Sequence, residues 1–285
     1  MRILITGAGG MLGLDLQAAA RTAAHDTTAL TRGELDITDA RAVRDVVAQA
    51  QPDVVIGCAA WTNVDGAETE RESAYAVNAT GAGNVAAAAA ASGAWTIHVS
   101  TDYVFDGTKT SPYLESDPVA PLSEYGRSKL AGERAVAECA PGTHTIIRSS
   151  WLFGARGRCF PKTMLRLAAE RDELTVVGDQ IGSPTFTGHL AAALVGLAEQ
   201  RERAAGVLHL AASKECSWCD FARAIVAAGP DAATTRVRAI TTAEYPTPAP
   251  RPAYSVLRSE RGAPVLPSWQ DGLASFMTEL AEVAA

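Results

Sequence analysis

RILITGAGGMLG, residues 2–13, contains the pattern that decides the fold. A short apolar run comes first, glycines follow at positions 7, 10 and 13, and a helical pattern of apolar residues continues to Ala20. A glycine turn between a strand and a helix lets the backbone approach a pyrophosphate, and the helix N-terminus offers free N–H groups. The stretch therefore predicts a dinucleotide-binding unit with Gly7, Gly10 and Gly13 at the cofactor.

Strand and helix patterns alternate along the next part of the chain. Continuous apolar runs predict buried strands at 53–60, 96–100 and 143–148, and helical patterns cover about 73–92 and 124–139. Such alternation is typical of α/β proteins with a parallel sheet. We therefore expect an α/β fold, a Rossmann-like doubly wound parallel sheet.

The composition changes at Trp151, where scattered basic and aromatic residues and shorter elements begin. A proline-rich stretch covers 243–252. From this change we expect an NAD(P)-binding Rossmann domain over 1–150 and a smaller C-terminal substrate-binding lobe over 151–285, with segments that interleave between the two.

Composition and charge limit the classes of function. Of the 285 residues, 47% are hydrophobic and 20% charged, which is ordinary for a globular protein, and no apolar run is long enough to span a bilayer. The net charge of −7 argues against a nucleic-acid partner. The chain opens on a strand pattern without signal-peptide features, and its five cysteines are an odd number, which favours reduced thiols. A cytoplasmic location is expected.

Tyr125 and Lys129 stand four residues apart in the helix expected over 124–139, so both side chains lie on one helical face. A nearby cation favours the phenolate, which brings the tyrosine pKa toward the working range for proton transfer at an alcohol or ketone. The pair alone is a weak signal because it arises often by chance. The strand over 96–100 delivers Thr101 to the same sheet edge, so we expect Thr101 beside the pair.

The end of the second strand carries information on the cofactor. It falls near Arg32, where a protein selective for NAD would carry an acid for the ribose 2′-hydroxyl. An arginine can face a 2′-phosphate, which favours NADPH over NADH, although a solvated turn residue is the alternative. The acid of the segment 36–39 is expected as a helix N-cap or an adenine-side contact.

Seven stretches in order along the chain resemble the dTDP-4-dehydrorhamnose reductases, a family of extended short-chain dehydrogenase/reductases. The ordered combination is far more specific than any single motif. The stretches are the glycines at 7, 10 and 13, AAWTNVD (59–65), STDYVF (100–105), YGRSK (125–129), RSSW (148–151), DQIGSPT (179–185) and YPTPAPRP (245–252).

The resemblance implies reduction of the C4 ketone of a dTDP-4-dehydro-6-deoxy-L-hexulose to dTDP-L-rhamnose, with NADPH or NADH as cofactor and a dTDP-sugar as substrate. It also implies a catalytic set of Thr101, Tyr125 and Lys129, the last holding the nicotinamide ribose. Further cofactor contacts implied by it are Gly10, Met11, Leu12, Asp36, Ile37, Ala60 and Thr62. We also expect Gly7, Gly13, Arg32, Ala59 and Asn78 at the cofactor. Implied substrate contacts are Thr101, Asp102, Tyr125, Trp151 and Arg251, with core packing as the alternative for Trp151 and a solvated loop for Arg251.

Two alternatives stay open. Cys159 stands where relatives usually carry asparagine, which leaves room for a related dTDP-4-keto-6-deoxysugar reductase of secondary metabolism. A non-catalytic regulatory subunit with a reductase-like fold is the alternative from another class, although the intact Tyr125 and Lys129 pair speaks against it. A dehydratase is disfavoured because Asp102 is followed by Tyr103 rather than by glutamate.

No metal site is predicted. The five histidines do not fall at ligand spacings, and the pair Cys216 and Cys219 lacks the second pair that a zinc ribbon needs. Some relatives bind magnesium through carboxylates at a dimer contact. Asp15 stands near one such position, but the sequence around His189 offers no acid, so magnesium is not supported and a homodimer is left open.

Overall fold

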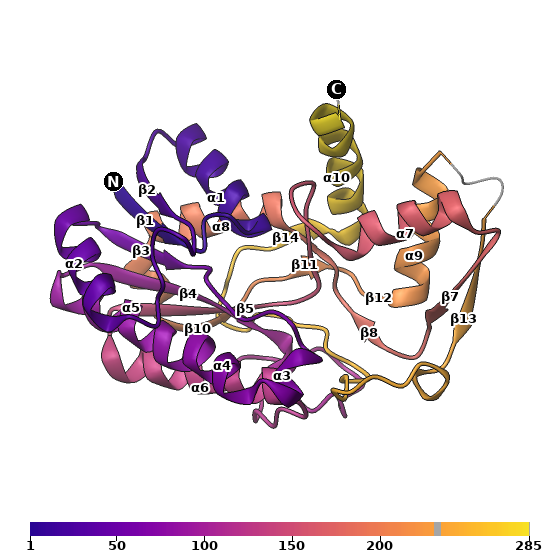
Figure 1. Ribbon diagram of the computed structural model, residues 1–285, viewed down its shortest axis with the longest axis horizontal. Helices are drawn as coiled ribbons and strands as arrows, with labels where there is room; N and C mark the ends of the chain where they lie inside the picture. Colours follow the sequence, from indigo (N-terminus) through magenta and orange to yellow (C-terminus); the bar gives the residue numbers. More distant parts are fainter. Residues whose placement is uncertain (231–234, 285) are drawn as a thin grey trace.

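The computed structural model describes residues 1–230 and 235–284. A six-stranded parallel sheet forms the middle layer of the larger part, on the left in Figure 1. Its strands are β1 (Arg2–Thr6), β2 (Asp26–Leu30), β3 (Val54–Gly57), β4 (Trp95–Thr101), β5 (His144–Ser149) and β10 (Gly206–His209). They lie in the order β10-β5-β4-β3-β1-β2, and every neighbouring pair is parallel.

Helices cover both faces of this sheet, as Figure 1 shows. Ile3 and Ile5 of β1 pack on one side, while Leu4 packs on the other, because successive strand side chains point to opposite faces. The first face is covered by α1 (Met11–Thr22) and α8 (Thr187–Glu199), and the second by α2 (Ala40–Ala50), α5 (Ala82–Ala91) and α6 (Glu124–Cys139). Burial on both faces explains why the strands are continuous apolar runs.

A smaller group of elements lies beside the sheet, on the right in Figure 1. Its core contains Phe153, Phe221 and Phe276, all nearly inaccessible to solvent. Its helices are α7 (Phe160–Glu170), α9 (Trp218–Ala228) and α10 (Trp269–Ala284). Its strand pairs are β7 (Glu173–Val177) with β13 (Arg236–Ile240), β8 (Ile181–Gly182) with β12 (Cys216–Ser217), β6 (Leu152–Phe153) with β9 (Thr185–Phe186), and β11 (Ala212–Ser213) with β14 (Leu266–Ser268).

The doubly wound parallel sheet is confirmed, and so are the strand, turn and helix at the N-terminus. The helix expected over 73–92 is instead α4 (Arg71–Tyr75), a π-helical segment η1 (Ala76–Gly81) and α5, preceded by the short helix α3 (Gly66–Thr69). The terminal helix α10 was not expected. Because β10 and α8 return to the main sheet, the two predicted domains interleave here, and their division at residue 150 stays a prediction.

Short 3-10 helices complete the described chain: η2 (Asp102–Val104), η3 (Arg201–Ala204) and η4 (Thr242–Glu244). No helix in the described ranges combines the length and the apolar character that crossing a bilayer requires.

Candidate active site

The turn after β1 depends on glycine for close backbone packing. Gly7 has φ +71°, and a β-carbon on it would lie 2.5 Å from the nitrogen of Ala59. A β-carbon on Gly13 would lie 2.5 Å from the carbonyl oxygen of Gly7. Gly10 precedes α1, whose first turn at Met11, Leu12 and Gly13 has N–H groups without intrahelical acceptors. These features fit the pyrophosphate of a dinucleotide.

A pocket of about 320 Å³ opens beside this turn, at the carboxyl ends of the strands. Eight of the residues expected at the cofactor line it: Gly7, Gly10, Arg32, Asp36, Ile37, Ala59, Ala60 and Thr62. Gly9, Leu35, Cys58, Trp61 and Val77 complete the lining. Glycines, small side chains and one cation are suited to a dinucleotide, and the residues present therefore fit such a cofactor.

The two acids of segment 36–39 have different positions. Asp39 is the N-cap of α2, where its carboxylate accepts two backbone hydrogen bonds at 2.9 and 3.0 Å, so the N-cap prediction is confirmed for this residue. Asp36 lines the pocket, and hydrogen bonds from the backbone and side chain of Thr38 lower its pKa. Arg32 is exposed at the pocket, which leaves its guanidinium free to meet a ligand there.

Thr101 ends β4 and meets the first turn of α6. Its Oγ1 accepts a hydrogen bond from the backbone N–H of Tyr103 at 3.1 Å and lies 3.0 Å from Oδ1 of Asp102. The rings of Tyr103 and Tyr125 meet edge to face, 5.5 Å apart. Gly126 is so close to Tyr103 that a β-carbon would lie 2.3 Å from its carbonyl oxygen. Glycine thus lets α6 press against the end of β4 and bring Tyr125 to Thr101.

Burial raises the pKa of Tyr125 to about 12, Asp102 adds to the rise, and a hydrogen bond with Thr101 opposes it. The net shift is upward because desolvation of the phenolate dominates it. That Lys129 depresses the pKa of Tyr125 stays a prediction. Tyr125 is consequently protonated at neutral pH and able to donate.

Lys129 is buried on the same helical face as Tyr125. Its Nζ donates a hydrogen bond of 2.6 Å to the carbonyl oxygen of Val99 in β4. Burial lowers the pKa of Lys129 to about 8, while Glu133 and Cys58 oppose the change.

Asn78 occupies the π-helical segment η1 and is completely buried. Its Oδ1 accepts from the backbone N–H of Trp61 at 2.8 Å, and its Nδ2 donates to the carbonyl of Trp61 and to Oγ of Ser128. Asn78 is not among the residues that line the described cofactor pocket. It instead joins the loop after β3 to α6, and irregular helical turns of this kind are common at functional sites.

A second pocket, of about 640 Å³, lies between the sheet and the smaller group of elements. Asp65, Tyr103 and Arg251 line it near Tyr125, and both apolar and polar side chains, many of them from α7 and β7, line the remainder. Its lining is Asp65, Tyr103, Phe160, Thr163, Met164, Leu167, Arg171, Glu173, Leu174, Thr175, Val176, Val177, Gln180, Trp218, Ile240, Tyr245, Thr247 and Arg251. A cavity that combines apolar side chains with polar and charged groups, including Arg171 and Arg251, suits a charged organic ligand.

Of the expected substrate contacts Arg251, Asp102 and Trp151, only Arg251 lines the ligand pocket. Asp102 is buried and does not line the pocket; the Ser255 hydroxyl lies beside its carboxylate and opposes the rise in the Asp102 pKa that burial causes. Trp151, with φ +48°, is not in the lining; its indole stacks on that of Trp218, with centroids 3.6 Å apart and planes 6° from parallel.

Several pocket residues escaped the sequence analysis. Trp218 lines the pocket. In the sequence it lies between Cys216 and Cys219, a pair that we considered only for metal or redox chemistry. Cys159, the residue behind the alternative of a different substrate, donates to the carbonyl of Gly154, whereas its neighbour Phe160 lines the pocket. Asp65 belonged to a recognised stretch, but nothing in the sequence indicated its partner.

Metal ligands do not gather in the described residues, where no group of three or more His, Cys, Asp or Glu side chains could hold an ion. Asp15 is buried, which raises its pKa, and it shares a third pocket with Glu279 and Arg156. The five cysteines are free, and burial raises the pKa of both Cys216 and Cys219.

The wholly parallel sheet, the glycine turn after β1 and the Thr101, Tyr125 and Lys129 arrangement define an extended short-chain dehydrogenase/reductase. Within that class, the chain belongs to the RmlD substrate binding domain family, whose model matches residues 1–282.

Three comparisons agree with this membership. A dTDP-4-dehydrorhamnose reductase of Burkholderia thailandensis is 44% identical, with 98% of this chain and 99% of the relative covered. The spore coat polysaccharide biosynthesis protein SpsK of Bacillus subtilis is 42% identical, covering 98% and 97%. The crystal structure of dTDP-4-dehydrorhamnose reductase from Bacillus anthracis, in complex with NADP, superposes with a TM-score of 0.92 at 40% identity, covering 98% and 99%.

Proposed function

We propose that the chain reduces the C4 ketone of dTDP-4-dehydrorhamnose, a dTDP-4-dehydro-6-deoxy-L-hexulose, to dTDP-L-rhamnose with NADPH, and less readily with NADH. The observation that carries the proposal is the meeting of Thr101 and Tyr125 at the end of β4, next to Tyr103, which lines the larger ligand pocket. Relatives with this named activity match nearly the whole chain, and one of them binds NADP.

Bound NADPH would supply the hydride. Tyr125 donates its phenolic proton to the C4 oxygen as negative charge develops there. Its pKa of about 12 keeps the proton on the phenol until a stronger base, the developing alkoxide, appears. Thr101 lies beside the phenol and positions it, and Lys129 holds α6 against β4 and offers its ammonium to the cofactor ribose. Gly7, Gly10 and Gly13 leave room for the pyrophosphate.

Oxidation of NADPH, followed by its absorbance in the presence of dTDP-4-dehydrorhamnose, tests the proposal, with the product identified by mass spectrometry and NMR. A panel of other dTDP-4-keto-6-deoxysugars and the same assay with NADH are run in parallel. Faster turnover of another sugar in the panel would favour the secondary-metabolite reductase. Binding of NADPH without turnover of any sugar would contradict catalysis and favour a regulatory subunit.

Two further expectations belong to the proposal. A homodimer is tested by sedimentation of the purified chain with and without NADPH. A cytoplasmic location agrees with the use of a reduced nicotinamide cofactor and is tested by fractionation of cells that express the chain.

A further inference from the structure

The loop after β3 borders both pockets. Trp61 and Thr62 line the cofactor pocket, and Asp65, three residues further along, lines the ligand pocket. No role was assigned to Asp65 by the sequence analysis, and the proposed hydride and proton transfer does not use it.

Asp65 binds a segment that lies 186 positions away in the sequence. Its Oδ2 accepts a hydrogen bond of 2.9 Å from Nη2 of Arg251, with which it forms an ion pair, and its Oδ1 accepts from the backbone N–H of Ala249 at 3.1 Å. Nη1 of Arg251 donates to the carbonyl of Ala249. One carboxylate therefore fixes both the backbone and the guanidinium of the proline-rich segment.

The loop that carries Asp65 is itself firmly held. Asn78 bonds both backbone groups of Trp61 and also reaches Ser128 in α6. Glu68, three residues after Asp65, accepts a hydrogen bond of 2.9 Å from the backbone N–H of Glu124, the first residue of α6. Asp65 is thus tied to the helix that carries Tyr125.

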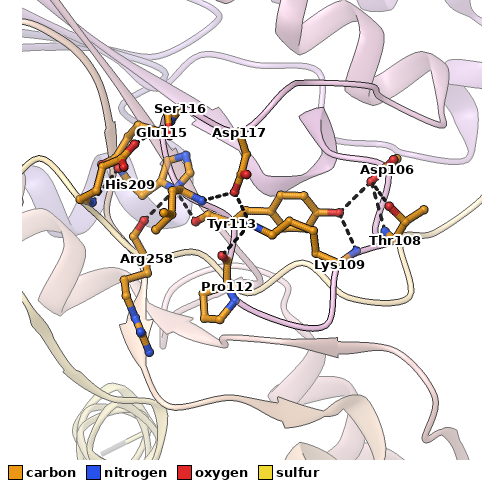
Figure 2. A network of polar contacts seen from close by, with 12 residues as sticks. Asp106, Thr108, Lys109, Pro112, Tyr113, Glu115, Ser116, Asp117, His209 and Arg258 are labelled. Atoms are coloured by element: carbon orange, nitrogen blue, oxygen red, sulfur yellow. Dashed lines mark hydrogen bonds and ion pairs between the residues drawn. The ribbon is translucent and has the colours of Figure 1, made fainter.

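The chain after Arg251 is also anchored, in the network of Figure 2. The backbone of Tyr113 donates to the carbonyl of Val256, and its carbonyl accepts from the backbone of Arg258. Nδ1 of His209, at the end of β10, contacts the carbonyl oxygens of both Tyr113 and Arg258 at 3.0 and 3.1 Å. The backbone just after Arg251 is held as well, because the carbonyl of Ala253 accepts from the N–H of Ile181. Asp65 is the residue that holds the guanidinium itself.

Arg251 retains the capacity to bind a ligand while it is paired. A guanidinium has five N–H donors, and the hydrogen bonds to Asp65 and Ala249 use two of them. The side chain is 16% exposed and lines the ligand pocket. The negative charge of a sugar nucleotide is carried by its diphosphate, the group that a planar arginine fork recognises best.

We propose that Asp65 is a positioning residue, which holds Arg251 at the ligand pocket for the diphosphate of the substrate. This inference rests on the proposed function for the identity of the ligand. The Asp65 carboxylate joins the proline-rich segment to the loop after β3, and Asn78 and Glu68 tie that loop to α6.

Titration of dTDP into the full chain saturated with NADPH tests the proposal. Asp65→Asn keeps the shape of the side chain but removes its charge, and we expect the Kd for dTDP to rise roughly tenfold, because a partly exposed charge-assisted bond is lost. Thymidine, which has no phosphate, should bind the variant and the unchanged chain to within about twofold. Glu72→Gln is the matched control, because Glu72 is an exposed acid on α4 whose side chain has no hydrogen bond or ion pair within the described residues, and it should leave dTDP binding unaltered.

Arg251→Gln separates positioning from a direct effect of Asp65. If Asp65 acts through Arg251, adding Asp65→Asn to Arg251→Gln should change the Kd for dTDP by less than about twofold. Asp65→Glu, which keeps the charge, should restore part of the affinity, and it supplies the test if the asparagine variant does not fold. Additive effects, equal losses for thymidine, or tighter dTDP binding by Asp65→Asn would overturn the inference.

The positioning role of Asp65 and the proposed reaction can fail separately in these experiments. A chain that binds dTDP in an Asp65-dependent way but turns over no dTDP-4-keto sugar would support the positioning role and contradict the reaction. If the unchanged chain reduces dTDP-4-dehydrorhamnose but Asp65→Asn binds dTDP normally, the reaction would be supported and the positioning role of Asp65 contradicted.

Discussion

Lys129 donates a hydrogen bond of 2.6 Å from its Nζ to the carbonyl oxygen of Val99, two residues before Thr101 in the same strand. The bond fixes the distance between the helix that carries Tyr125 and the strand that ends in Thr101. Lys129 therefore has a structural task in addition to the cofactor contact proposed for it. Its buried side chain can bond Val99 and also meet the cofactor ribose only because α6 packs directly against β4.

Arg32→Ala should raise the KM for NADPH roughly tenfold and leave that for NADH unchanged, because the exposed guanidinium at the cofactor pocket would lose a charge-assisted bond to the 2′-phosphate. Initial rates with each cofactor measure the effect. Arg44→Ala removes an exposed arginine of α2 and should affect neither KM. Equal changes for both cofactors would contradict a 2′-phosphate role.

Trp218→Ala should weaken dTDP binding at least fivefold, since an aromatic face at a pocket contributes about 1–3 kcal/mol when it stacks on a base. Trp218→Phe should retain much of the affinity. Binary NADPH affinity, measured by fluorescence, should stay constant in both variants. Retention of dTDP affinity within about twofold by Trp218→Ala would mean that the Trp151 and Trp218 stack serves packing alone.

Asp102→Asn should remove a pH dependence of stability. Burial raises the pKa of Asp102 from 3.8 to about 6, so between these values the folded carboxyl keeps a proton that the unfolded chain has lost. Stability therefore falls as pH rises through this window, by at most about 3 kcal/mol, and the loss remains complete above it.

Urea unfolding of both chains at pH values near 4 and near 8 measures this effect. The unfolding free energy of the unchanged chain minus that of Asp102→Asn should be larger at the acidic value. A difference that is the same at both pH values would show that Asp102 does not titrate as its burial requires.

Features that depend on a local sequence pattern could be predicted from the sequence. The glycine turn at 7–13 and the buried strands follow from local backbone demands, and the spacing of Tyr125 and Lys129 follows from the helical period. The doubly wound parallel sheet was also predictable, because alternating strands and helices can cover both faces of a sheet in only a few ways.

Features that depend on distant contacts could not be predicted. Asp65 meets Arg251 only because the proline-rich segment crosses back to the loop after β3. The side of Trp218 that faces the pocket depends on the packing of α9 against α7. The pKa of Tyr125 rises because the folded chain excludes water from it, and desolvation has no local signature in the sequence.

Turnover by Tyr125→Phe at saturating NADPH and dTDP-4-dehydrorhamnose tests the central claim most directly. The substitution keeps the ring and its contact with Tyr103 but removes the hydroxyl that donates the proton. We predict a kcat lower by ~10²–10⁴ with NADPH affinity unchanged, as is typical when a positioned general acid is lost. A kcat within about threefold of that of the unchanged chain would contradict the claim that Tyr125 supplies the proton.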